Sequence, residues 1–226
     1  MEIQPIARIR SDFMEKFGIP RQSGLVEALR SQVIFEPSYR SREAVRGLED
    51  FSHIWLIWEF SQARREGWSP TVRPPRLGGN RRVGVFASRS PFRPNSLGLS
   101  VVRLEQVELS ASLGPVLHVA GADLLDGTPI YDVKPYVPYA DAISGASGGF
   151  AGQVERRRLE VVCPPALLAR LPEEKREALL GVLAQDPRPS YQDDPERVYG
   201  MCFAGAQIRF TVEEEVLSVT EIEPDS

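Results

Sequence analysis

The sequence has few of the residues on which metal sites, disulfides and histidine-based catalysis depend. Only two cysteines, Cys163 and Cys202, and two histidines, His53 and His118, occur in 226 residues. Two distant thiols make no disulfide framework, and the absence of a CxxC pair argues against a structural zinc site. We therefore interpret both cysteines as inert thiols in a reducing compartment and expect no metal.

Several nucleotide-binding and hydrolase motifs are also absent. The chain contains no Walker loop, no GxGxxG after a strand, no HExxH and no GxSxG. The common P-loop, Rossmann, zinc-protease and serine-hydrolase templates therefore do not fit. The apolar run "IWLIW" is too short to cross a bilayer, and the first residues lack the apolar core of a signal peptide. We expect a cytoplasmic protein without a membrane segment.

Acidic residues are missing from one long stretch of the chain. No Asp or Glu occurs from Gly67 to Leu104, although the same stretch contains seven arginines and the net charge of the chain is −4. A polyanion responds to the local field, so this segregation is typical of a nucleic-acid-binding face. The alternative is a solvated face that acidic residues from elsewhere in the chain neutralise.

The distribution of apolar residues predicts a mainly β protein. The best central strand is the β-branched and aromatic run at 52–60, and shorter strands are predicted on both sides of it. A short helix is expected over 41–51, and a shift of the apolar phase within 97–109 suggests a β-bulge. Many short strands without long helices between them favour a closed β-barrel.

A change of composition divides the chain. Residues 141–152 are small and rich in glycine, which is typical of a flexible linker. After them we expect strands and one amphipathic helix over 171–186, with Pro172 in its first turn. The sequence thus predicts a barrel domain over 1–140, a linker over 141–152 and a small α+β domain over 153–226.

One motif, "SRSPFRPNSLG" at 88–98, joins stiffness to positive charge. Pro91 and Pro94 each fix one backbone angle and restrict the preceding residue, so Arg89 and Arg93 need little ordering to reach one place. Guanidinium groups bind carboxylates and phosphates bidentately, and Asn95 is suited to a base edge or to capping the turn. The alternative is a rigid turn whose arginines pair with surface acids.

A second motif, "DLLDGTPIYDVKPY" at 123–136, combines a turn with a polar strand. Asp126 and Gly127 make the turn, Thr128 follows, and Pro129 begins the strand. Alternation along this strand places three polar side chains on one side of it. These side chains are those of Asp132, Lys134 and Tyr136. The polar loop at 18–24 and Trp68, in the arginine-rich loop, are further candidates for ligand contacts.

These residues leave three classes of function open. A non-catalytic nucleic-acid-binding barrel explains the arginines but not the polar strand. An enzyme acting on a small anionic metabolite explains Arg89 and Arg93 but leaves the basic loop at 67–82 unused. A nucleic-acid-modifying enzyme with a diffusible co-substrate explains both features.

The motifs together resemble the TsaA-like family of tRNA methyltransferases. The resemblance rests on "GIPRQSG", "FSHIWLIWEF", "VRPPRLGG", "SRSPFRPNSLGLS" and "DLLDGTPIYDVKPYVPYAD", and "DPRPSY" and "VYGMCF" resemble the extra domain of bacterial members. It implies a non-Rossmann β-barrel methyltransferase, a homodimer with its active site near the subunit interface, and S-adenosyl-L-methionine as donor. The implied substrate is the N6 atom of N6-threonylcarbamoyladenosine at position 37, beside the anticodon.

The resemblance also implies a donor site. Relatives often have histidine at the position of Ser61, so a backbone contact is expected there. The implied donor-binding residues are Pro20, Arg21, Gln22, Ser61, Gln62, Arg89, Leu99, Asp126, Gly127, Thr128 and Pro129.

Chemistry then assigns the remaining candidates. Asp126, Asp132 or Tyr136 would accept the N6 proton, and Lys134 or an arginine would clamp the threonyl carboxylate. Arg93 and Asn95 would contact the modified nucleoside. The phosphates of the anticodon arm would meet Arg73, Arg76, Arg81 and Arg82, with Arg188 and Tyr191 as weaker candidates.

Overall fold

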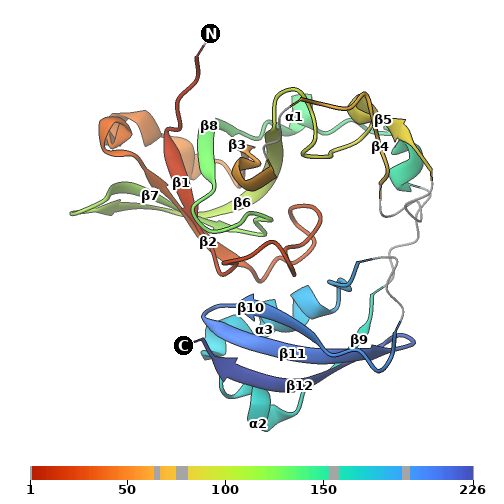
Figure 1. Cartoon of the computed structure of the whole chain (residues 1–226). Coiled ribbons are helices and arrows are strands. Elements are labelled where there is room, and N and C mark those ends of the chain that lie inside the picture. The colour runs from red at the N-terminus through yellow and green to blue at the C-terminus, as the bar shows by residue number, and fades with distance from the viewer. Residues whose placement is uncertain (1, 64–66, 75–80, 153–157, 190–193, 226) are drawn as a thin grey trace.

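A computed structural model describes residues 2–63, 67–74, 81–152, 158–189 and 194–225. Its larger part is a closed barrel in the order β1-β2-β7-β6-β3-β8, in which neighbouring strands are antiparallel. The mainly β fold and the closed barrel predicted from the sequence are confirmed (Figure 1). The barrel strands are β1 (Ala7–Arg10), β2 (Arg30–Phe35), β3 (His53–Glu59), β6 (Leu97–Ser110), β7 (Gly114–Ala120) and β8 (Pro129–Pro135).

Strand β3 shows why this sequence closes into a barrel. Its side chains alternate, so Ile54, Leu56 and Trp58 are buried in the barrel core while Trp55 and Ile57 face outward. The strand pairs with β6 on one side and β8 on the other, so the run forms a strand of the sheet interior, as its composition predicts. The apolar stripe of each strand thus closes around one core.

The long strand β6 differs in detail from its prediction. A bulge is present, between Leu104 and Gln106 in the pairing with β7, after the positions where the apolar phase changes. The phase changes earlier because Leu99 faces outward and is 50% exposed, whereas Ser100 and Val102 face the core. The buried polar side chain of Ser100, rather than the exposed leucine, is the informative feature of this strand.

Short elements complete the barrel domain. In place of the single helix expected over 41–51, two 3₁₀ turns, Arg42–Val45 and Leu48–Asp50, lie on either side of Gly47. Gly47 has φ of 82°, a left-handed conformation that ends a helix. Other short elements are β4 (Thr71–Val72), β5 (Val83–Gly84), α1 (Pro138–Asp141) and the 3₁₀ turns Pro37–Tyr39, Ser61–Ala63, Val85–Ala87 and Gly149–Gly152.

The C-terminal part is a separate α+β unit. Its four strands have the order β10-β11-β12-β9, and α3 covers one face of the sheet (Figure 1). Pro172 is the N-cap of α3 rather than a residue of its first turn. The boundaries 1–140, 141–152 and 153–226 stay a prediction. The elements are β9 (Glu160–Val162), α2 (Pro165–Leu168), α3 (Glu173–Leu183), β10 (Tyr199–Phe203), β11 (Ala206–Glu213) and β12 (Val216–Pro224).

Neither cysteine has the features of a reactive thiol. Burial raises the pKa of Cys202 to about 11, and the nearby carboxylates of Asp225 and Glu15 act in the same direction. Burial also raises the pKa of Cys163. Both thiols are free, and a protonated thiol is a poor nucleophile and metal ligand. Within the described part of the chain, no helix combines the length and apolarity needed to cross a membrane.

Candidate active site

The first of two cavities opens where strands β3 and β6 meet the loops that follow and precede them. It has a volume of about 750 Å³, which lies within the range of about 300–1,000 Å³ usual for small-ligand sites. Four segments form its walls: residues 16–22, the end of β3 with the turn after it, the loop at 88–98, and the turn at 123–128. The polar side chains that line it include Lys16, Arg21, Gln22, Glu59, Gln62, Arg89, Arg93, Asn95, Asp123 and Thr128.

The loop at 88–98 is held largely by its own hydrogen bonds. Arg93 donates from Nη1 to the Ser88 carbonyl at 3.1 Å, and Ser88 donates from Oγ to the Val85 carbonyl at 2.9 Å. The Phe92 amide donates to Ser90 Oγ at 3.2 Å. Together with Pro91 and Pro94, these bonds give the stiff loop that the motif predicts.

The two arginines of this loop have different partners. Arg89 reaches across the cavity and donates a hydrogen bond from Nη1 to Gln22 Oε1. Arg93 turns back onto Ser88 and lines both this cavity and a second, adjoining hollow. Both arginines thus line one cavity, and Arg89 bridges two of its walls.

The floor of the cavity includes a chain of polar groups, of which Trp58 and Ser100 are buried and Asp123 is half-buried. Trp58 donates from Nε1 to Ser100 Oγ at 3.0 Å, and Ser100 donates from Oγ to Asp123 Oδ1 at 2.7 Å. Burial raises the pKa of the Asp123 carboxyl above its ordinary value of 3.8, although the Ser100 hydrogen bond and the charge of Arg89 oppose this rise. A desolvated carboxylate is costly, so this group is suited to a cationic or hydrogen-bond-donating ligand.

Close packing under the floor requires glycine at position 98. A Cβ atom there would lie 2.3 Å from the indole of Trp58, which pairs with Gly98 across β3 and β6. The indole therefore lies flat beneath the backbone of β6 and reaches Ser100. The glycine of the motif at 88–98 thus fixes the orientation of the floor.

Most of the predicted donor-binding residues meet at this cavity. Three do not line it. Asp126 accepts a hydrogen bond from the Ser11 amide at 2.9 Å, Gly127 accepts one from Arg8 at 3.1 Å, and Pro129 begins β8. These three shape the turn that presents Thr128. The donor-binding residues that line the cavity are Pro20, Arg21, Gln22, Ser61, Gln62, Arg89, Leu99 and Thr128.

The polar strand does not reach the cavity of its own chain. Asp132 and Lys134 pair across β3 with Ile57 and Trp55, the outward-facing residues, and form an ion pair with each other at 3.1 Å. The Tyr136 ring packs against Trp55 with centroids 5.9 Å apart. These three catalytic candidates therefore lie on the outer surface of the barrel, and the fourth, Asp126, serves the turn.

A second hollow adjoins the loop at 88–98. It has a volume of about 1,000 Å³ and shares with the first cavity five residues of this loop, Pro91, Phe92, Arg93, Asn95 and Leu97, and two residues outside it, Glu59 and Ala63. Its lining also includes Trp68, which is 53% exposed and contacts the exposed ring of Phe86. The loop thus borders both hollows.

The predicted phosphate contacts are only partly clustered. Arg73, Arg81 and Arg82 are exposed next to the β4–β5 pair, while Arg76 lies outside the described residues, as does Tyr191. Arg188 is buried and binds Asp186 through two nitrogens, at 2.9 and 3.0 Å. Arg188 therefore stabilises the C-terminal unit and is not placed to meet phosphates.

The cavity residues that sequence reasoning missed include Trp58, Glu59, Phe60 and Asp123. Glu59 is buried and accepts a hydrogen bond from the Tyr131 hydroxyl at 2.7 Å. A signal for Asp123 existed, because it precedes the turn motif in "DLLDGTP" and follows a buried strand. Trp58 is both buried and part of the cavity floor.

Two family models match the chain. The model of the tRNA-methyltransferase O N-terminal domain matches residues 8–142, and that of the TrmO C-terminal domain matches residues 156–225. The chain belongs to the tRNA-methyltransferase O family. This confirms the resemblance inferred from the motifs, and the cavity lies within the part matched by the N-terminal model.

Curated and solved relatives in the tRNA-methyltransferase O family agree. A tRNA (adenine(37)-N6)-methyltransferase of Escherichia coli is 40% identical over 99% of this chain and 98% of the relative. One from Eikenella corrodens is 50% identical over 72% of this chain and 92% of the relative. A crystal structure of TrmO from Pseudomonas aeruginosa superposes with a TM-score of 0.80 at 37% identity, covering 99% of this chain and 97% of that one.

Proposed function

We propose that this protein transfers a methyl group from S-adenosyl-L-methionine to N6 of N6-threonylcarbamoyladenosine at position 37 of tRNA. As a member of its family the chain is an S-adenosyl-L-methionine-dependent tRNA adenine N6-methyltransferase, which decides against a non-catalytic barrel and against a metabolite enzyme. The threonylcarbamoyl group and the anticodon arm are the proposed refinements.

The observation that carries the proposal is that one stiff loop, at 88–98, lines two adjoining hollows. Methyl transfer from a sulfonium is an in-line displacement, in which the S–CH₃ bond breaks as the N6–CH₃ bond forms. Such a reaction depends on holding donor and acceptor on opposite sides of one point. The cavity floored by Asp123 holds the donor, the hollow beside Trp68 holds the modified adenosine, and the loop at 88–98 aligns them.

Each hollow has chemistry that suits its ligand. The donor carries a sulfonium and an ammonium group, which the Asp123 carboxylate attracts, while Arg89 meets its carboxylate. On the acceptor side, Trp68 and Phe92 offer stacking surfaces for an unstacked base. A guanidinium has five N–H donors, so Arg93 binds the threonyl carboxylate while keeping its bond to Ser88.

The N6 proton requires an acceptor as the methyl group arrives. Asp132, Lys134 and Tyr136 lie outside the cavity of their own chain, so they take part only if a second copy receives them. We propose a homodimer in which this outer strand faces the partner's acceptor hollow. A mixture of Arg89→Ala and Asp132→Ala chains then regains activity that each variant alone lacks. Activity no greater than the sum of the two variants excludes this arrangement.

The exposed arginines beside β4 and β5 are proposed to contact the phosphates of the anticodon arm. Replacing Arg81 and Arg82 together by alanine lowers the slope of log affinity against log salt by about 0.7–0.9 for each phosphate that is no longer neutralised. Filter binding at several salt concentrations measures it. An unchanged slope would contradict a role for these two residues.

The decisive test is transfer of labelled methyl to two anticodon-arm RNAs, with and without the threonylcarbamoyl group. We expect label only on the modified RNA, and Arg93→Ala to reduce that label. Equal labelling of both RNAs would retain the methyltransferase and exclude the carboxylate clamp. Labelling of neither RNA, with the donor bound normally, would exclude this acceptor.

A further inference from the structure

Residues 11–29 connect two barrel strands, β1 and β2, but their apolar side chains pack into the core of the C-terminal unit. Phe13, Val26 and Leu29 are buried in the same apolar cluster as Leu179 of α3 and Phe203 of β10. The rings of Phe13 and Phe203 meet edge to face with centroids 5.4 Å apart. Figure 1 shows this connection on the side of the barrel that faces the C-terminal sheet. One core is therefore built from two domains.

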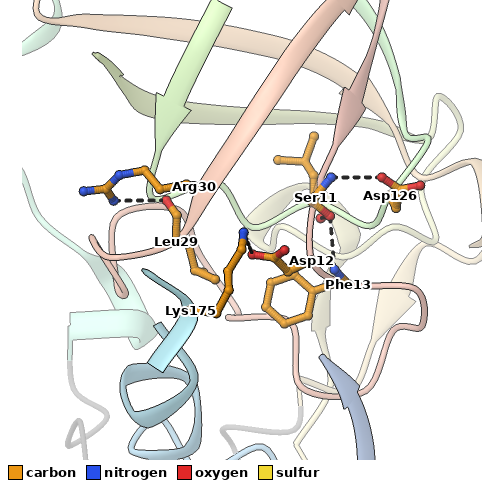
Figure 2. A network of polar contacts seen from close by, with 8 residues as sticks. Ser11, Asp12, Phe13, Leu29, Arg30, Asp126 and Lys175 are labelled. Atoms are coloured by element: carbon orange, nitrogen blue, oxygen red, sulfur yellow. Dashed lines mark hydrogen bonds and ion pairs between the residues drawn. The ribbon is translucent and has the colours of Figure 1, made fainter. Parts of the chain in front are cut away.

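Polar contacts reinforce the same junction. Asp12 forms an ion pair with Lys175 of α3 at 2.7 Å, with side chains only 13% and 24% exposed (Figure 2). The Asp12 carbonyl accepts a hydrogen bond from the Ala204 amide at 2.9 Å. Glu15 accepts one from the Cys202 amide at 2.8 Å. Because the ion pair is largely removed from water, its charges are weakly screened.

The connection at 11–29 and the C-terminal unit are closely packed at two glycines, Gly18 and Gly181. A Cβ atom at Gly18, whose φ is +91°, would lie 2.4 Å from the end of Met201. A Cβ atom at Gly181 in α3 would lie 2.7 Å from Cγ1 of Val26. The connection therefore has little freedom to shift toward the C-terminal unit.

The opposite face of the same connection is a wall of the donor cavity. It supplies Lys16, Ile19, Pro20, Arg21 and Gln22 to the lining. Its first residues are tied to the barrel by Ser11, whose amide donates to Asp126 at 2.9 Å (Figure 2). Arg21 also donates to a carbonyl of the C-terminal part, that of residue 188, at 3.2 Å.

We propose that the C-terminal domain positions the donor-binding wall at residues 16–22, with Lys175 and the α3 surface at Gly181 as positioning elements. The proposal rests on the function proposed above, in which this cavity holds S-adenosyl-L-methionine. A wall that is ordered before binding costs the ligand less, and loosening it lowers the fraction of molecules that are competent to bind. The C-terminal domain thereby sets donor affinity without touching the donor.

The experiment compares variants on the two sides of the junction. Lys175→Met removes the ion pair with Asp12, and Gly181→Ala pushes a methyl group toward Val26 while favouring the helix itself. Arg209→Met is the matched control, because its ion pair with Glu221, at 3.2 Å, joins two strands of the C-terminal sheet. Lys175→Arg restores the charge and should restore function.

Calorimetry gives the dissociation constant of S-adenosyl-L-methionine, and methyl transfer gives KM for donor and for tRNA separately. We expect Lys175→Met and Gly181→Ala to weaken donor binding by about 3- to 30-fold, with KM for tRNA unchanged and the control unaffected. Unchanged donor affinity in both folded variants would overturn the proposal, as would a rise confined to KM for tRNA. Failure of the wild type to bind the donor would instead overturn the proposed function.

Discussion

Two walls of the cavity proposed to bind the methyl donor are held in place by opposite means. The loop at 88–98 carries its own prolines and its own hydrogen bonds, such as that from Arg93 to Ser88. The wall at 16–22 has few such internal bonds among its described contacts and is held from outside, by the barrel through Ser11 and by α3 through Asp12. Local stiffness can be read from a sequence, whereas support from a distant element cannot.

The difference also predicts how each wall fails. A self-supporting loop is disturbed only by changes within it or directly beneath it. An externally supported wall is disturbed by residues that lie far from it in the sequence, such as Lys175. Arg89 joins the two walls through its hydrogen bond to Gln22. A change at Arg89 is therefore expected to disturb both walls at once.

The largest effect is expected for Arg89→Ala. The change removes the contact between the two walls and the positive charge beside Asp123. We therefore expect the rate of methyl transfer to fall about a hundredfold, which is the usual loss when a preorganised hydrogen-bond donor is removed from an active site. Arg103→Ala is the control, because Arg103 is exposed on β6 and pairs with Glu105. Equal activity of the two variants would remove Arg89 from the site.

A smaller effect, on stability, is expected for Gly98→Ala. The new methyl group would overlap the Trp58 indole, so we expect a loss of about 1–3 kcal/mol in the free energy of unfolding. Denaturant unfolding measures it. Gly84→Ala is the control, since nothing lies within 4 Å of a Cβ atom there. Equal stability of the two variants would show that the floor is not tightly packed against the strand.

The smallest effect is expected for Asp123→Asn, and its sign depends on pH. The folded state raises the pKa of this carboxyl, so it binds the proton more tightly than the unfolded chain does. The charged group therefore lowers stability once the pH exceeds the raised pKa, and this penalty disappears below the ordinary value of 3.8. We expect the variant to be more stable than wild type at neutral pH and to lose this advantage on acidification.

Unfolding midpoints from pH 8 downward test this expectation. The same variant should bind S-adenosyl-L-methionine more weakly at neutral pH, because it lacks the charge that meets the cationic donor. A variant that is less stable than wild type throughout would show that the carboxylate is structurally required. Unchanged donor binding would place the donor away from Asp123.

The sequence predicted the fold and one side of the site because their causes are local. The β-branched and aromatic run at 52–60 identified a barrel strand, and the prolines of 88–98 identified the rigid loop. The family resemblance then named eight residues that line one cavity. The expected helix over 41–51 was wrong because Gly47 adopts a left-handed conformation that separates two short turns.

The rest was decided by tertiary structure. The barrel could close with either face of β8 inward, and the alternation of polar residues along the strand does not say which face is buried. The structure shows that the face with Asp132, Lys134 and Tyr136 is the outer one. The raised pKa of Asp123 is caused by its burial, which follows from folding. Phe13 lies near the N-terminus of the chain and is nevertheless buried in the apolar core of the C-terminal unit. The sequence by itself determined the elements and the stiff loop, since these depend on neighbours along the chain. Burial, the joining of the two walls and the support of one of them by α3 depend on contacts between distant residues, which only folding brings together.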